Sequence, residues 1–223
     1  LEGIDWQQNG DGTASRIGDG NVTIGEYDGF NQIMMNIGSL YYPEKPANEI
    51  AEQIAVESLS SPQLMQYICL NICTILEMSG NQHAQIGQEI LETAYRYTTA
   101  NFEYGDVVSL MKKGPNTRGK SRNTFLVKGG HPCDLYELIV KSIAENPPIM
   151  KLEFEDVKKR IYGMISDDCK KPTPQAIKES LAKLQELLHG REDIFKVLDW
   201  KEGVLYILDP LFLFYLRWGG GSK

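Results

Sequence analysis

The sequence predicts a mainly α-helical protein divided into two domains. Apolar residues recur at three- and four-residue spacing through most of the chain, which is typical of amphipathic helices. Close to the C-terminus the pattern changes to alternation around a glycine turn, which predicts one β-hairpin. The charge is also unevenly distributed: the net charge is −12 over residues 1–108, +6 over 109–131 and −2 over 132–218. A basic stretch between an acidic and a mixed half indicates a connector between two domains.

The first domain is predicted to be all-helical. Residues 1–25 are rich in Gly, Asn and Asp, and we expect an irregular segment with one short strand at 21–24. Residues 26–104 carry four helical patterns, which begin near positions 26, 47, 62 and 85. In the third, Ser61 suits the N-cap and Pro62 the first helical position. Two adjacent apolar rows predict that this third helix is central to its domain.

The second domain is predicted to be a winged helix. Residues 105–132 are read as a basic connector, and residues 133–218 as the domain. Helices are expected from 134, from 154 and from 173, with a short strand at 149–154 between the first two. A hairpin that turns at Lys201–Gly203 and a last apolar helix over 210–218 follow. Three helices with a hairpin and a covering segment define a winged helix, and residues 219–223 are interpreted as a tail or cloning scar.

The composition is that of an ordinary globular protein, with 42% hydrophobic and 24% charged residues. No apolar run reaches the roughly 20 residues of a membrane helix, and no signal peptide is recognisable. The four cysteines show no metal-ligand spacing, and the three histidines lie far apart in the sequence. We therefore expect a cytoplasmic location, no membrane partner and no metal site. Catalysis by this chain alone is not expected.

The stretch "GPNTRGKS", Gly114–Ser121, fits the phosphate-loop pattern G-x-x-x-x-G-K-[ST]. In a working phosphate loop Lys120 would reach the outer phosphates and Ser121 would hold Mg²⁺. Such a loop follows a buried strand and opens a helix, whereas Lys112 and Lys113 precede this one and strand-forming residues follow it. We interpret the match as a coincidence. A self-contained nucleotide-binding enzyme that uses this loop remains an alternative.

The bases of the connector suggest a second alternative, contact with nucleic acid. A DNA-binding winged-helix module of an initiator-like or transcription-regulating protein would use such a cluster. In the third helix of the domain, however, lysines are offset by glutamates, so nucleic acid is not the favoured partner. The candidate residues are Lys112, Lys113, Arg118, Lys120 and Arg122.

Three stretches resemble a known family. "AEQIAVESLSSPQLMQYICLNIC", Ala51–Cys73, is similar to the lid of prokaryotic STAND-type and related AAA+ ATPases. "NPPIMKLEF", Asn146–Phe154, and "DPLFLFYLRW", Asp209–Trp218, resemble the winged helix that follows the lid in these ATPases. The resemblance implies a four-helix lid domain over 26–104. It also implies that the ATPase core, which would hold ATP or ADP with Mg²⁺, lies N-terminal to Leu1.

The family resemblance also implies a site and partners. The lid would touch the nucleotide through the turn formed by Ser60, Ser61, Pro62 and Gln63. Ser60 replaces the usual glycine and Gln63 the usual sensor arginine, which favours a conformational clamp over lid-assisted hydrolysis. The expected partners are the core of the same parent protein, an effector and a second copy. Such switch ATPases often act in signalling or antiviral defence.

Overall fold

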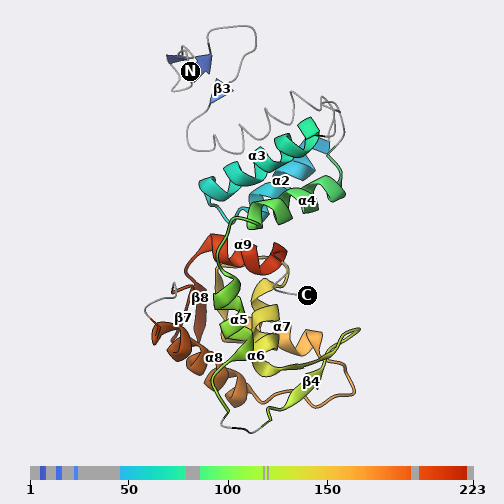
Figure 1. Ribbon diagram of the computed structural model, residues 1–223, viewed down its shortest axis with the longest axis vertical. Coiled ribbons are helices and arrows are strands. Elements are labelled where there is room, and N and C mark those ends of the chain that lie inside the picture. The colour runs from blue at the N-terminus through green and yellow to red at the C-terminus, as the bar shows by residue number, and fades with distance from the viewer. Residues whose placement is uncertain are drawn as a thin grey trace. The chain divides into compact units, whose positions relative to one another are not determined.

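The structure, a computed structural model, describes residues 6–8, 14–16, 23–24, 46–78, 86–117, 119, 121–191 and 196–219. The helices are α2 (Pro46–Glu57), α3 (Pro62–Met78), α4 (Gln88–Thr99), α5 (Gly105–Lys113), α6 (Leu135–Ala144), α7 (Phe154–Met164), α8 (Pro174–His189) and α9 (Pro210–Trp218). The strands are β1 (Trp6–Gln8), β2 (Ala14–Arg16), β3 (Thr23–Ile24), β4 (Thr124–Leu126), β5 (Pro132–Asp134), β6 (Lys151–Glu153), β7 (Leu198–Lys201) and β8 (Val204–Ile207). The prediction of a mainly α protein is confirmed (Figure 1).

The chain forms two compact units, residues 1–91 and residues 92–223. In the first unit β1, β2 and β3 make an antiparallel sheet, and α2 packs against α3. Most of the apolar residues predicted to face the core from α3 are buried, at Leu64, Met65, Ile68, Ile72 and Leu76. Of the two cysteines in the same rows, Cys69 is half-buried and Cys73 is exposed. The helix expected from residue 26 lies outside the described residues.

Helix α6 is the centre of the second unit. It contacts α5, α7, α8 and α9, and Figure 1 shows α5 and α7 beside it. Its side chains Leu138, Ile139, Val140 and Ile143 are completely buried. The helix begins with a capping box, in which the Asp134 carboxylate accepts from two amides of the first turn and Glu137 accepts from the Asp134 amide. A helix that is apolar on nearly all sides must be surrounded, and here four helices surround it.

A three-stranded antiparallel sheet of order β6-β8-β7 covers the same core. Leu152 of β6 lies opposite Leu205 of β8, and both are fully buried, while the alternate residues of β6 are exposed. Strands β7 and β8 form the predicted hairpin. Its two-residue turn places Glu202 at φ 54° and Gly203 at φ 81°, the left-handed values of a type I′ turn.

The range 105–132, which the sequence analysis read as a basic connector, contains regular structure. Residues 105–113 form α5, whose Val107, Val108 and Met111 are buried. Strand β4 pairs with β5, and Val127 bridges to Ile165 after α7. The amphipathic pattern of α5 is short, and its basic residues made the segment look like a linker. Lys112 and Lys113 lie in the last turn of α5, where positive charge stabilises the negative end of the helix dipole.

Candidate functional site

The turn between α2 and α3 holds the backbone in a strained conformation. Leu59 and Ser60 are adjacent non-glycine residues with φ of 53° and 60°. Each such residue costs on the order of 1 kcal/mol or more, and a branched side chain such as leucine seldom adopts it. The turn is stabilised by the Ser61 amide, which donates to the Ser58 carbonyl at 2.8 Å. Ser60 therefore holds a conformation that glycine adopts more easily.

The predicted residues after the turn begin helix α3. The Ser61 hydroxyl accepts from the Leu64 amide at 3.3 Å and Pro62 is the first helical residue, so the predicted cap and start are confirmed. Pro62 and Gln63 are exposed. The Gln63 side chain donates to the Tyr67 hydroxyl at 3.0 Å. The four residues thus form one continuous turn that presents hydroxyl and amide groups to solvent.

The stretch Gly114–Ser121 has a helix before it and a strand after it, which is the reverse of the order around a phosphate loop. Helix α5 precedes Gly114 and strand β4 follows Ser121, whereas phosphate binding at a helix N-terminus needs a strand first and a helix after. Gly114 is buried at φ 57°, and a Cβ there would lie 2.7 Å from the Tyr136 ring. Packing against Tyr136 thus accounts for the first glycine of the pattern. Lys120 lies outside the described residues.

Arg122 holds this segment in place. Its guanidinium donates to the Lys113 carbonyl at 2.6 Å and to the Pro115 carbonyl, and it pairs with Asp134 at 2.8 Å. It also stacks 4.7 Å above the ring of Tyr136. Such a bonded guanidinium joins the end of α5 to the start of α6. Of the other predicted nucleic-acid contacts, Lys112 is half-buried, Lys113 is exposed, and Arg118 lies outside the described residues.

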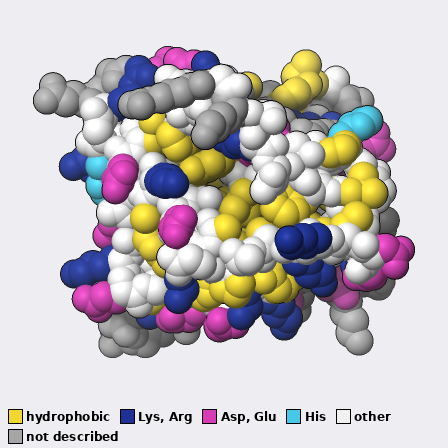
Figure 2. Space-filling view, turned by 90° about the horizontal axis from the view of Figure 1, so that it is seen from below, with side chains coloured by type: hydrophobic (Ala, Val, Ile, Leu, Met, Phe, Trp, Pro, Cys, Tyr) yellow, Lys and Arg dark blue, Asp and Glu magenta, His cyan; other side chains and the backbone are white. Residues whose placement is uncertain are grey.

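The outer face of α8 carries balanced charge. Lys178 and Lys183 are exposed beside Glu179 and Glu186 on the same helix. The Lys178 ammonium lies 4.6 Å from the centre of the Phe154 ring, which leaves it partly engaged within the protein. On the face shown in Figure 2, basic and acidic side chains are interspersed with apolar ones. Among the charged side chains of α8, the two lysines are thus balanced by two glutamates.

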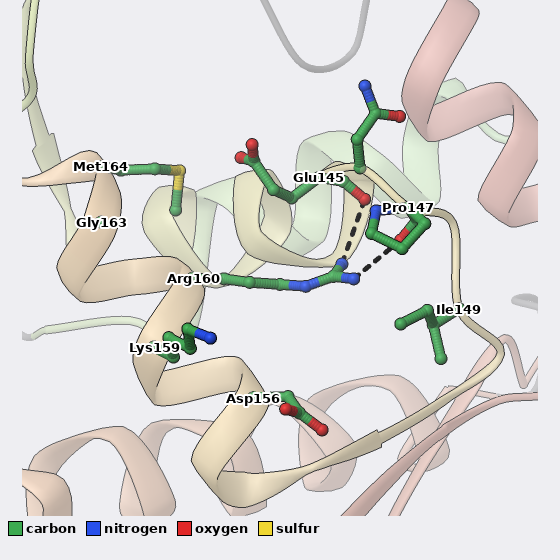
Figure 3. Close-up of a pocket in the computed structure, with 9 residues that line it drawn as sticks. Glu145, Pro147, Ile149, Asp156, Lys159, Arg160, Gly163 and Met164 are labelled. Carbon is green, nitrogen blue, oxygen red and sulfur yellow. Dashed lines mark hydrogen bonds between the residues drawn. The ribbon is translucent and has the colours of Figure 1, made fainter.

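A cavity of about 490 Å³ opens at the C-terminal end of α6 (Figure 3). It lies between the segment that leaves α6 and one face of α7. Its apolar lining residues include Pro147, Ile149 and Met164, and the charges of its lining cancel. The lining residues are Glu145, Asn146, Pro147, Ile149, Asp156, Lys159, Arg160, Gly163 and Met164.

Two arginines bind the end of α6 beside this cavity. Arg160 of α7 donates to the carbonyls of Ser142, Glu145 and Pro147 at 3.0, 3.1 and 2.7 Å. Arg217 of α9 donates to the Ala144 carbonyl at 2.7 Å and to the Asn146 side chain at 2.6 Å. These bonds satisfy carbonyls that a helix end leaves without an intrahelical donor.

The charge of Arg160 is set by this environment. Burial lowers the pKa of Arg160 from its usual value and the charge of Arg217 lowers it further, while Glu145 and Asp156 raise it. An arginine stays protonated despite such a shift, so the guanidinium acts as a permanent fork of donors. The site is therefore built for structural anchoring of α6, with a neutral open cavity beside it.

The sequence matches no protein-family model, and neither a characterised protein nor a solved structure is significantly similar to it. Within the described part of the chain, no helix is long and apolar enough to cross a membrane. The same residues contain no cluster of His, Cys, Asp and Glu that could hold a metal ion.

The residues that organise the second unit could not be recognised from sequence patterns. Arg160 and Arg217 were unremarkable as single charges within helices, and their acceptors are main-chain carbonyls 13 to 73 residues away. No local signal pointed to these arginines, because α6 carries a basic residue of its own, Lys141, in its last turn.

Proposed function

We propose that this chain is the lid and winged-helix region of a STAND/AAA+-type ATP-binding switch, in which the winged helix docks on protein. The observation that carries the proposal is the connectivity of the second unit. From α6 to β8 its elements follow in the order α6, β6, α7, α8, β7 and β8, with sheet order β6-β8-β7. A winged helix has this arrangement, with α8 as its third helix and the β7–β8 hairpin as its wing.

Helix α9 supports the resemblance that began with "DPLFLFYLRW". Asp209 caps the helix by accepting from the Leu211 amide at 2.9 Å, and Pro210 is its first residue. The apolar residues then enter the core, with Phe212, Phe214 and Leu216 fully buried. This stretch is thus part of the domain itself, as the winged-helix endings of the family would require.

The strained turn at Leu59–Ser60 supports the nucleotide-contact part of the proposal. Backbone strain of this kind is concentrated at functional sites, where a ligand contact compensates for it. In the proposal, ATP or ADP with Mg²⁺ sits in a core that precedes Leu1, and the Ser60–Gln63 turn closes on it. The nucleotide switches the protein only because its affinity differs between the closed and open arrangements.

The balanced charge of α8 favours a protein partner for the winged helix over DNA. Binding to a DNA duplex requires positive side chains that neutralise its phosphates. Glu179 and Glu186 place negative charge on the face of α8 that would enter the groove. Interspersed charges are instead suited to a protein surface of complementary pattern. The partner in the proposal is the ATPase core or an effector.

Calorimetry on two polypeptides tests the proposal. The 223-residue chain alone should show no binding of ATP with Mg²⁺, and a longer parent polypeptide that includes the core should bind it. In the longer polypeptide, Pro62→Gly should weaken binding of ADP, while Pro174→Gly at the start of α8 serves as the matched control. Binding by the short chain that disappears in Lys120→Ala would instead make Gly114–Ser121 a phosphate loop and overturn the proposal.

A further inference from the structure

The outer edge of strand β7 is closed by side chains of α8. The Trp200 amide donates to the Gln185 side-chain oxygen, and the His189 ring lies 3.2 Å from the Leu198 carbonyl. Both main-chain groups point away from β8, since the β7–β8 ladder uses the alternate residues. Another strand could not pair with β7 without displacing these two side chains.

The outer edge of strand β6 is open. The Ile207 amide donates to the Met150 carbonyl at 2.7 Å, and the Phe154 amide donates to the Gly203 carbonyl at 2.9 Å. Because bonded residues alternate along an antiparallel pair, Leu152 also faces β8, and Lys151 and Glu153 face outward. Among the described residues, none is hydrogen-bonded to the Lys151 main chain or to the Glu153 amide.

We propose that a second copy of this chain pairs antiparallel with this edge, about a two-fold axis at Leu152. Lys151 of each copy then lies opposite Glu153 of the other. The Glu153 amide of each copy donates to the Lys151 carbonyl of the other, so the pair forms reciprocally. Glu153 is the N-cap of α7, so its carbonyl accepts the first hydrogen bond of that helix. The pairing between copies does not require this carbonyl. The two three-stranded sheets become one continuous sheet, and this inference is independent of the proposed function.

The charges specify this register. Lys151 and Glu153 lie on the same exposed face, with side chains 58% and 59% accessible, and their mutual contact is a surface pair at 3.6 Å. Charged residues on an edge strand normally prevent pairing between copies. Here, a shift of two residues in one direction would oppose Lys151 to Lys151, and in the other Glu153 to Glu153. Only the register centred on Leu152 joins opposite charges.

Space is available beside the edge. The cavity at the end of α6 is lined by Ile149 and Asp156, which lie on either side of β6 in the sequence (Figure 3). Gly163 lines that cavity within α7, where a glycine weakens the helix, and a Cβ there would meet no atom within 4 Å. Internal packing of the described residues thus gives no reason for this glycine. An approaching second copy would find an open surface here.

Sedimentation equilibrium on the 223-residue chain and its charge variants tests the inference. We expect a concentration-dependent dimer whose dissociation constant rises roughly tenfold or more in Lys151→Glu and in Glu153→Lys, because each change makes two like-charge pairs. The double variant should regain the affinity. A mixture of the two single variants should form the heterodimer, because every facing pair then has opposite charge. Lys183→Glu on α8 is the matched control and should dimerise like the native chain.

Two outcomes would overturn the inference. A native chain that stays monomeric up to hundreds of micromolar concentration would exclude this dimer. A dimer that both single variants retain would have to form through another surface. Circular dichroism of each variant excludes misfolding as the cause of a lost dimer, since the exposed Lys151–Glu153 contact contributes little to stability.

Discussion

The hydroxyl of Tyr104 donates a hydrogen bond to the Asp209 carboxylate, across 105 residues of sequence. Asp209 uses its other oxygen to cap α9, and Tyr104 is the residue before α5. One carboxylate therefore joins the starts of two helices that both pack on α6. The Tyr104 ring adds edge contacts to Phe212 at 5.6 Å and to Tyr215 at 5.8 Å between ring centres. The hydrogen bond and the ring contacts fix α5 against α9.

Removal of this hydroxyl should destabilise the second unit. We expect Tyr104→Phe to lower the free energy of unfolding by about 1–2 kcal/mol, the range for a half-buried hydrogen bond to a charged group. Chemical denaturation followed by circular dichroism measures the change. Tyr215→Phe is the matched control and should lie within about 0.5 kcal/mol of the native chain. Both variants keep the ring, so equal losses would mean that the bond to Asp209 is not the specific cause of the destabilisation.

The same bond makes stability depend on alkaline pH. Burial, followed by the hydrogen bond to Asp209 and its negative charge, raises the pKa of Tyr104 above its usual 10.0. A raised folded-state pKa gives stability that is complete below pH 10 and is lost as pH rises further, because the unfolded chain ionises first. The stability difference between the native chain and Tyr104→Phe should therefore shrink above pH 10. Denaturation of both proteins at pH 8 to 11 measures it, and a constant difference would contradict this origin.

The arginine at the end of α6 is expected to be a stabilising residue. Arg160→Ala leaves three main-chain carbonyls without their donor, and we expect a loss of about 2–3 kcal/mol in the free energy of unfolding. Arg160→Lys keeps the charge but lacks the fork of donors, so it should recover less than half of the loss. Thermal and denaturant unfolding measure both effects.

Lys159 provides the control for Arg160, because it is exposed on the same turn of α7 and lines the same cavity. Lys159→Ala should change the free energy of unfolding by no more than about 0.5 kcal/mol. If Arg160→Lys proved as stable as the native chain, charge at the helix end rather than the carbonyl bonds would explain the role of Arg160.

The sequence predicted the elements whose signals are local. The helix expected from residue 173 is such a case, because the N-cap Thr173 and the first helical residue Pro174 are neighbours in the chain. The Thr173 hydroxyl accepts from the Ala176 amide. The hairpin turn at Lys201–Gly203 is local in the same way. The Arg160 and Arg217 bonds and the Tyr104–Asp209 bond join distant segments, so no spacing rule could reveal them. Helix α5 was missed because its apolar side is only three residues wide and its partners come later in the chain.

The turn between β7 and β8 offers a stabilising substitution. Glu202 is held at φ 54°, a left-handed value that asparagine adopts more easily in the first position of a type I′ turn. We expect Glu202→Asn to raise the free energy of unfolding by about 0.5–1 kcal/mol. Glu202→Val should lower it, because a β-branched residue resists this conformation. An unchanged stability in both variants would show that the hairpin turn carries no strain.

The two glycines of "GPNTRGKS" separate a packing role from a phosphate-binding role. At Gly114, alanine would strain the backbone at φ 57° and press a Cβ into the Tyr136 ring at 2.7 Å. At Gly119, alanine would meet no atom within 4 Å and only φ 85° opposes it. We therefore expect Gly114→Ala to cost about 2–4 kcal/mol and Gly119→Ala about 1 kcal/mol in the free energy of unfolding.

A phosphate loop would give a different pattern, because both glycines would then let the backbone approach the phosphates. Gly119→Ala would abolish ATP binding in calorimetry while the fold stayed nearly intact. If Gly114 instead serves packing against Tyr136, Gly114→Ala should lower the free energy of unfolding more than Gly119→Ala does. The native chain should then bind no ATP. Since the two glycines sit five residues apart in one segment, the pair of variants compares a buried contact with an exposed turn and leaves the rest of the chain unchanged.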